Sequence, residues 1–419
     1  MQSKQKTFIT VTFVSLISIF VGFYALSASS THKNGINRPT LRSNSGIHDP
    51  NKDDTTDVIF NRKEQTRIKN TNRKLQRYKN RTRERNSDEQ LANNDKVEKN
   101  FNKSVDSSTH GKKYLIYSCL FDKPCSGWAD RQRAIISGFL LAQITNRTFG
   151  IILTSPCDLK KFFVPNEYNW VVDENELVGL STATPSGSSL GNIGVLDFDK
   201  AYTEDLVYFQ TKRDMLLAIK KNPLHAKSIP QWAKYSKPVA FKNGWNILMK
   251  RTPQFDKKFQ KLMSGVPRHS QFVCAHVRLA KNPTIPMETR VINTYPSVKY
   301  LWAFLDTRYP NASRIFVATD SFDVREWARQ HFKDKEMDTG LTILHIEKQK
   351  RKKNSCDGFE SVLLDQQVMI HCDVLVCSYS NICKHAAYIS GIHDQLFMFR
   401  YGKIGPAKTW PEIYNQPRI

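Results

Sequence analysis

The chain has 419 residues, of which 40% are hydrophobic and 24% charged, and this length could hold two or three ordinary domains. Its 63 Lys and Arg outnumber its 39 Asp and Glu, which gives a formal net charge of +24. Runs of Arg and Lys can bind nucleic acid phosphates. The runs here lie in a segment that we expect in a lumen, so nucleic acid is not an expected partner.

The N-terminus carries a long apolar segment. A polar tail over residues 1–6 precedes "TFITVTFVSLISIFVGFYALSAS" over 7–29. An uncharged run of roughly 20 residues can cross a bilayer as a helix, which predicts a signal anchor. A cleaved signal peptide ending at "ALSAS" is the alternative, although its apolar region would be shorter. Basic residues flank the run on both sides, so the positive-inside rule leaves the orientation open.

Sequons and cysteines indicate an oxidising lumen. All eight cysteines lie between Cys119 and Cys383, and an even number suits disulfides. Cys119 and Cys125 could form a disulfide that closes a local loop. A zinc site is the alternative, but the sequence contains no C-x-x-C pair. N-glycosylation sequons begin at Asn80, Asn102, Asn146 and Asn311.

Residues 30–112 are rich in Asn, Lys, Arg, Asp, Ser and Thr, with "NRKEQTRIKNTNRKLQRYKNRTRERN" at their centre. Such a composition offers too little apolar surface to offset chain entropy, which predicts a disordered stem. Its charge could also engage anionic glycans or lipid headgroups. A coiled coil over 62–85 lacks a sustained apolar heptad.

The folded part begins with alternating strand and helix patterns. A strand is predicted over 112–121, a helix over 129–145 and a strand over 147–155. A second series follows, with strands over 271–279, 313–320, 341–346, 373–378 and 395–400, and helices over 297–309, 321–332, 360–372 and 381–390. Buried strands alternating with amphipathic helices predict parallel α/β sheets. We expect two Rossmann-like domains, over 113–265 and 266–419. The less regular region over 168–243 gives no clear prediction of secondary structure.

Polar residues gather at three strand ends of the second series. Ligands bind at the carboxyl ends of strands in open α/β sheets, where helix N-termini also point N–H groups outward. An arginine fork beside such helices suits a diphosphate, so a nucleotide pocket is predicted. These residues also have structural interpretations: helix caps for the Asp, Ser and Asn, a core position for the histidine and a salt bridge for the arginine. The residues are His276, Arg278, Thr319, Asp320, Ser321, Ser378, Tyr379, Ser380 and Asn381.

Four segments resemble, in order and spacing, the motifs shared by the α1,2-, α1,6- and protein O-fucosyltransferases. They are "GWADRQRAIISGFLLAQITNRTFGI", "HVRLAKNPTIP", "IFVATDS" and "DQQVMIHCDVLVCSYSNICKHAAYISG". The "GWADR" signature is most similar to invertebrate α1,6-fucosyltransferase-like sequences. The resemblance implies a GT-B fold, with the active site in the cleft between two Rossmann-like domains. It also implies inverting transfer from GDP-fucose, with no metal and no cofactor, by a type II protein of the Golgi membrane with a luminal catalytic domain.

The resemblance also implies residue roles. Arg278 matches the arginine that holds the donor β-phosphate and offsets charge on departing GDP, and His276 would border the nucleotide. Where the family often has H-x-R-x-G-D, this chain has Ala280 and Lys281. Alanine adopts the unusual backbone angles of glycine less readily, so the loop departs from the family there. The remaining donor-binding candidates are Asp320, Ser321, Ser380 and Asn381.

Transfer to a hydroxyl requires a proton acceptor as well as a stabilised leaving group. We predict Asp130 as that base, at the start of the first long helix, where capping that helix is its alternative role. Arg131 is predicted on the acceptor side, and Arg133 would face either the cleft or solvent. The acceptor could be a glycan or a glycoprotein: a GlcNAc, a galactose or a protein Ser/Thr. The protein could also form a homo-oligomer.

Three other functions compete with fucosyl transfer. Asp197 and Asp199 form a D-x-D, by which another class of glycosyltransferase holds a divalent cation and a sugar nucleotide. A luminal sulfotransferase would need a phosphosulfate loop after its first strand, and "CLFDKPCSGWADR" is a poor match for one. A non-catalytic glycan-binding protein of the same fold is the third, and the altered loop at Ala280 favours it.

Overall fold

The computed structural model describes residues 111–120, 125–186, 189–346 and 355–407, all of which belong to one compact unit. The predicted tail and anchor, almost all of the predicted stem, and the sequons at Asn80 and Asn102 lie outside these residues. None of the helices in the described part has the length and hydropathy that crossing a bilayer requires. The other two sequon asparagines, Asn146 and Asn311, are exposed.

The first sheet has four strands in the order β2-β1-β5-β4, and its pairs are parallel. Helix α2 (Trp128–Ile144) connects β1 to β2, as predicted. Gly138 lets α2 lie close to the sheet, because a Cβ there would come within 3.1 Å of Phe209 and 3.2 Å of Phe149. The strands are β1 (Tyr114–Cys119), β2 (Thr148–Leu153), β4 (Thr182–Ala183) and β5 (Leu206–Phe209).

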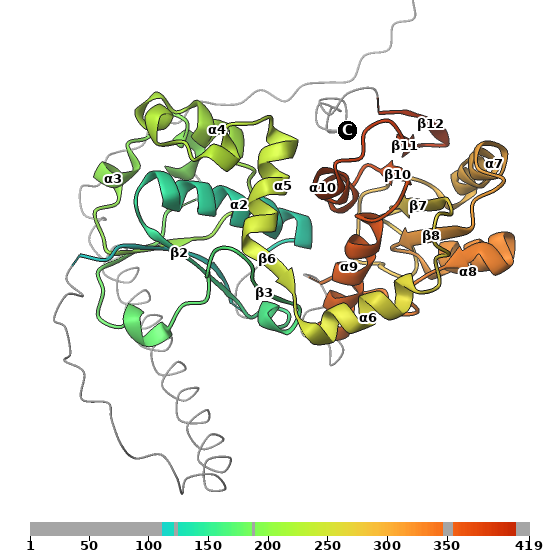
Figure 1. Cartoon of the computed structure of the whole chain (residues 1–419), viewed down its shortest axis with the longest axis horizontal. Helices are drawn as coiled ribbons and strands as arrows, with labels where there is room; N and C mark the ends of the chain where they lie inside the picture. Colours follow the sequence, from blue (N-terminus) through green and yellow to red (C-terminus); the bar gives the residue numbers. More distant parts are fainter. Residues whose placement is uncertain (1–110, 121–124, 187–188, 347–354, 408–419) are drawn as a thin grey trace, which may run out of the picture. The chain divides into compact units, whose positions relative to one another are not determined.

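The second sheet has six strands in the order β12-β11-β10-β7-β8-β9, with β12 alone antiparallel to its neighbour. Val273 and Val277 of β7 face a core with α7 and α8, whereas Phe272 and Cys274 face a core with α9 and α10. Figure 1 shows these helix pairs on opposite sides of the sheet. The strands are β7 (Phe272–Val277), β8 (Arg314–Thr319), β9 (Glu336–Met337), β10 (Val374–Ser378), β11 (Leu396–Arg400) and β12 (Lys403–Pro406). The helices are α7 (Val298–Arg308), α8 (Phe322–Phe332), α9 (Ser355–Met369) and α10 (Asn381–Ser390).

The region that the sequence left open supplies strands β4 and β5 and several short helices. A separate antiparallel pair joins β3 (Phe163–Pro165) to β6 (Met249–Arg251). The α-helices of this middle part are α3 (Phe198–Ala201), α4 (Leu216–Lys221), α5 (Lys237–Leu248) and α6 (Pro253–Met263). The 3-10 helices along the chain are Leu159–Lys161, Glu174–Leu177, Ser189–Asn192, Pro223–Ser228, Gln231–Ala233, Tyr295–Ser297 and Lys333–Lys335.

The predicted α/β class is confirmed, and nearly all predicted elements are present. The strand predicted over 341–346 is wrong, because that segment is irregular and Glu336–Met337 forms the edge strand instead. Two of its apolar residues, Ile343 and Ile346, are buried in the wall of a cavity. The predicted boundary at 265/266 falls between α6 and β7, and the largest core cluster includes residues from both sides of it.

All eight cysteines form disulfides, which suits an oxidising compartment. The predicted Cys119–Cys125 pair is confirmed. No group of three metal-ligating side chains occurs in the described ranges. The other pairs are Cys157–Cys356, Cys274–Cys372 and Cys377–Cys383.

Candidate functional site

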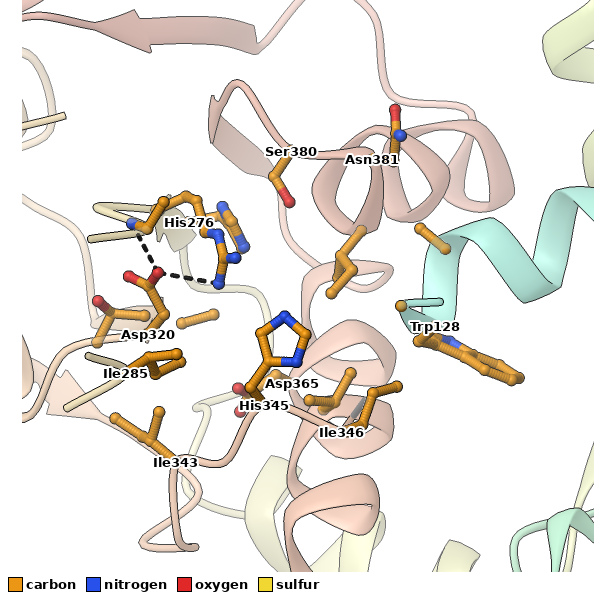
Figure 2. A pocket seen from close by; sticks show the side chains of 18 of the residues that line it. Trp128, His276, Ile285, Asp320, Ile343, His345, Ile346, Asp365, Ser380 and Asn381 are labelled. Atoms are coloured by element: carbon orange, nitrogen blue, oxygen red, sulfur yellow. Dashed lines mark hydrogen bonds and ion pairs between the residues drawn. The ribbon is translucent and has the colours of Figure 1, made fainter. Parts of the chain in front are cut away.

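A cavity of about 420 Å³ lies at the carboxyl ends of β7, β8 and β10. The first turn of α2, the loop over 280–292, residues 343–346 and helix α9 form the rest of its wall. Figure 2 shows Asp320 and His276 on one side and Trp128 on the other, with Ser380 and Asn381 at the start of α10. The cavity therefore occupies the position that open α/β sheets commonly use for ligands.

Most of the predicted site residues line this one cavity, although they come from four separate elements. Ser321 and Arg131 are not in its lining. Ser321 is 1% exposed, and its hydroxyl accepts a hydrogen bond from Val324 N at 3.4 Å, so it caps α8. The predicted residues that line the cavity are Asp130, His276, Arg278, Thr319, Asp320, Tyr379, Ser380 and Asn381.

Arg131 is fully buried instead of facing an acceptor. Its guanidinium donates to the carbonyl of Ser126 at 3.0 Å and to that of Ser155, and it lies over the ring of Phe359. A buried cation needs such partners. Its position supports a structural role, and the predicted acceptor-side role would require the side chain to reach the cavity.

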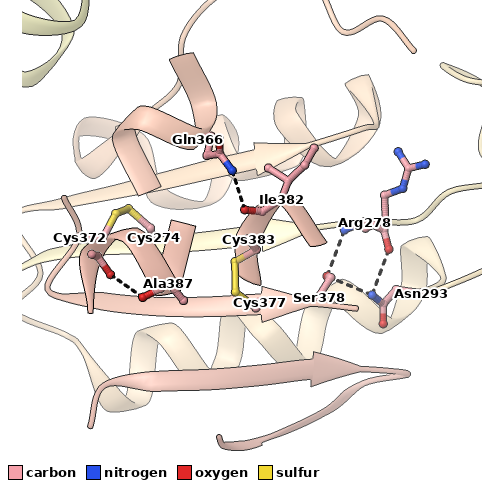
Figure 3. Close-up of a disulfide and its surroundings, with 11 residues drawn as sticks. Cys274, Arg278, Asn293, Gln366, Cys372, Cys377, Ser378, Ile382, Cys383 and Ala387 are labelled. Carbon is pink, nitrogen blue, oxygen red and sulfur yellow. Dashed lines mark hydrogen bonds between the residues drawn. A yellow bond between two sulfur atoms is a disulfide. The ribbon is translucent and has the colours of Figure 1, made fainter. Parts of the chain in front are cut away.

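Arg278 projects from the end of β7 and is partly exposed. Its guanidinium lies 2.9 Å from the Asp320 carboxylate and 3.4 Å from that of Glu288. Its backbone N–H donates to Ser378 Oγ at 3.0 Å, which ties β7 to β10 (Figure 3). The predicted salt bridge and the predicted place in the pocket are thus both present.

Asp320 supports the loop that follows Arg278. Its carboxylate accepts hydrogen bonds from Leu279 N at 2.9 Å and Ala280 N at 2.8 Å. Burial raises the pKa of Asp320, while Arg278 and these N–H groups lower it. With its oxygens engaged in this way, the carboxylate positions the loop and the arginine.

Ala280 has a φ of 70°, in the left-handed region that favours glycine. The position where the family often has glycine therefore does require that backbone conformation. The conformation is held by the bond from Ala280 N to Asp320 and by a bridge between Ala280 and Val291. Alanine therefore adopts this backbone conformation at the cost of some strain.

His276 is buried beneath the cavity, with 8% of its surface exposed. Burial, together with the positive charge of Arg278, lowers the pKa of His276 to about 3. Its Nδ1 has no hydrogen-bond partner among the described residues. A neutral ring that lines the cavity fits this environment, whereas an acid-base role at neutral pH does not.

Asp130 lies at the third position of α2, since Gly127 is the N-cap. Its carboxylate accepts a hydrogen bond from Arg133 at 2.5 Å and is 26% exposed. Burial raises the pKa of Asp130, against the effect of Arg133. A partly exposed carboxylate with a raised pKa, lining the cavity, can accept a proton.

The start of α10 faces the cavity. Ser380 is the N-cap and makes no side-chain capping bond, so its hydroxyl can serve a ligand. Cys377 and Cys383 form a disulfide across this turn, from the end of β10 to the first turn of α10 (Figure 3). Helix N-termini favour phosphate groups, and this one is fixed covalently to its strand.

Sequence reasoning missed four residues of the site. Glu288 lies between Arg278 and His345, whose Nε2 is 2.9 Å from the same carboxylate. Asn293, which is 1% exposed, donates to the carbonyl of Arg278 at 3.1 Å. Asp365 lines the cavity, and burial raises its pKa to about 7. Three of these residues lie in irregular segments, where periodicity gives no signal.

The two carboxylates of the D-x-D sequence have structural partners away from the cavity. Asp197 caps α3 and pairs with Lys200 at 3.0 Å. Asp199 lies 3.6 Å from the buried Arg147. Neither aspartate lines the cavity, so this motif has a structural explanation.

No protein-family model matches the chain, and no curated protein matches it. Solved structures that it resembles include the fucosyltransferase NodZ from Bradyrhizobium, with 13% identity over 70% of this chain and 98% of that one and a TM-score of 0.45. Another is a mutant of Arabidopsis thaliana FUT1 with GDP, with 12% identity over 68% and 70% and a TM-score of 0.49. POFUT1 with GDP gives 13% identity over 67% and 96%, with a TM-score of 0.37.

Proposed function

We propose that the protein is an inverting, metal-independent fucosyltransferase that uses GDP-fucose as its donor. The observation that carries the proposal is the cavity itself, where Arg278 and the start of α10 converge at the strand ends. These are also the segments that carry the family motifs. The acceptor is a glycan or glycoprotein, and the site of action is the Golgi lumen, with the chain anchored as a type II membrane protein.

The chemistry follows from the groups in the cavity. An acceptor hydroxyl attacks C1 of fucose while the bond from C1 to the GDP oxygen breaks, with inversion at C1. Arg278 and the N–H groups of α10 stabilise the charge that GDP gains. The hydroxyl proton passes to a carboxylate of the cavity, and Asp130 is our first choice because it is not paired with Arg278. Glu288 is the second choice, since it contacts Arg278 and His345. Asp320 is engaged by two N–H groups of the loop as well as by Arg278.

The test is binding and transfer with a panel of GDP-sugars by wild type and Arg278→Ala. We expect transfer of fucose in EDTA by wild type, and a loss of at least about 100-fold in kcat/KM in the variant, since removing one charge-stabilising donor typically costs this much. Arg278→Lys is the matched control, and it should retain part of the activity because it keeps the charge but not the fork. Equal transfer by Arg278→Ala would contradict the assignment, and GDP-fucose binding without transfer would favour a non-catalytic glycan-binding protein.

A further inference from the structure

The charge around the cavity presents a problem for a phosphate ligand. Carboxylates outnumber guanidinium groups in the lining. The charged residues in question are Asp130, Glu288, Asp320 and Asp365 against Arg278 and Arg290. An anionic diphosphate needs cations that are not already neutralised.

Arg278 cannot supply this charge alone. Its guanidinium lies within salt-bridge distance of both Asp320 and Glu288, so the three groups together carry a net negative charge. The neighbouring His276 is neutral, because burial lowers its pKa to about 3. The N–H groups at the start of α10 supply only partial charges, so a full positive charge has to come from another side chain at the same cavity.

Arg290 is placed to provide it. The residue is exposed and lines the cavity, and no carboxylate lies within salt-bridge distance of it among the residues that the structure describes. Its guanidinium lies over the ring of Tyr379 at 5.5 Å. Because Tyr379 lies between Ser378 and Ser380, this stacking holds Arg290 beside the start of α10.

The backbone around Arg290 is also fixed. Its carbonyl accepts a hydrogen bond from Lys281 N at 2.8 Å, and the next residue, Val291, forms an antiparallel bridge with Ala280. The loop that leaves β7 at Arg278 therefore returns at Arg290. Its two ends present two arginines to one cavity.

We propose that Arg290 is a second cationic contact for the donor diphosphate, beside Arg278. The inference rests on the proposed function. A guanidinium can bind phosphate oxygens through two parallel N–H bonds, and stacking on an aromatic ring leaves those N–H groups available. Arg290 then supplies charge that is not already neutralised by a carboxylate.

Arg400 offers a matched control. It lies over the same Tyr379 ring at the same 5.5 Å, but it does not line the cavity. If Arg290 merely supports Tyr379, Arg290→Gln and Arg400→Gln should have equal effects. If Arg290 contacts the diphosphate, only its own replacement should weaken nucleotide binding.

The experiment is calorimetric binding of GDP and of guanosine to the full chain at low and high salt. We expect Arg290→Gln to weaken GDP at least about 10-fold, to reduce the salt dependence of GDP binding and to leave guanosine affinity unchanged. Arg290→Lys should recover part of the loss, and Arg400→Gln should match wild type. Wild-type affinity for GDP in Arg290→Gln, or equal losses in the Gln variants, would overturn the inference. Failure of wild type to bind GDP would overturn the proposed function, and this inference with it.

Discussion

The two sheets end in different ways, although both alternate parallel strands with helices. In the second sheet, β7, β8 and β10 end in polar residues that line the cavity. The first half contributes only the first turn of α2 to the described lining, and Asp130 is its one carboxylate there. The same α/β pattern therefore places the polar lining of the cavity on the second sheet, and the first half supplies only the wall formed by the start of α2. If this division is correct, changes in the second half should affect nucleotide binding, and changes at α2 should affect turnover.

The largest expected effect comes from comparing one carboxylate from each half. Asp320 is 7% exposed and engages Arg278 and two backbone N–H groups. A buried N–H group left without its partner costs about 1–3 kcal/mol, and Asp320 is the partner of two. Asp320→Ala should therefore lower the free energy of unfolding by about 3 kcal/mol or more in urea titrations. Asp130→Asn should cost less than about 1 kcal/mol, because its pair with Arg133 is partly exposed.

Activity separates the two carboxylates further. Asp130→Asn should keep GDP affinity and lower kcat if Asp130 is the base, whereas Asp320 variants should weaken GDP because Arg278 loses its support. A normal kcat in Asp130→Asn would show that Asp130 is not the base, and Glu288 would then be the candidate. Glu288→Gln tests that alternative under the same conditions.

Two short disulfides offer a closer comparison. Cys119–Cys125 follows β1 and Cys377–Cys383 follows β10, and both have a sequence separation of 6. Since disulfide stabilisation depends on loop length, each double Ala variant should lose roughly the same stability, about 2 kcal/mol. Only Cys377→Ala/Cys383→Ala should weaken GDP binding, since its loop carries Ser380 at the cavity.

Thermal unfolding and GDP titration of both double variants measure these two quantities separately. A loss of GDP affinity in the Cys119→Ala/Cys125→Ala variant as large as in the other would show that the effect is general destabilisation. In that case the covalent bond at the start of α10 would have no specific part in nucleotide binding.

The same division explains what the sequence could predict. Strands such as β7 and helices such as α10 follow from apolar periodicity, and the polar residues at their ends follow from their place in the alternation. Glu288 and His345 lie in segments without periodicity, and only the tertiary fold brings them to the cavity. The same holds for Asn293, which the fold brings to the Arg278 backbone. The prediction of a strand over 341–346 was wrong for a related reason. The apolar residues of this segment line the cavity, and its backbone does not pair with a neighbouring strand.

The smallest effect is expected at Ala280. A non-glycine residue in the left-handed region costs about 1–2 kcal/mol, and replacing it with glycine removes this cost. Glycine also makes the unfolded chain more flexible, which offsets part of the gain in stability. Ala280→Gly should therefore raise the free energy of unfolding by about 0.5–1 kcal/mol. Gly391→Ala is the reverse control: its φ is 84° at the end of α10, so it should lose about 1 kcal/mol. A destabilised Ala280→Gly would mean that the buried methyl group, with 1% of the residue exposed, contributes more to packing than the strain costs. An unchanged kcat/KM in that variant would show that alanine at this position already holds Arg278 in its working geometry.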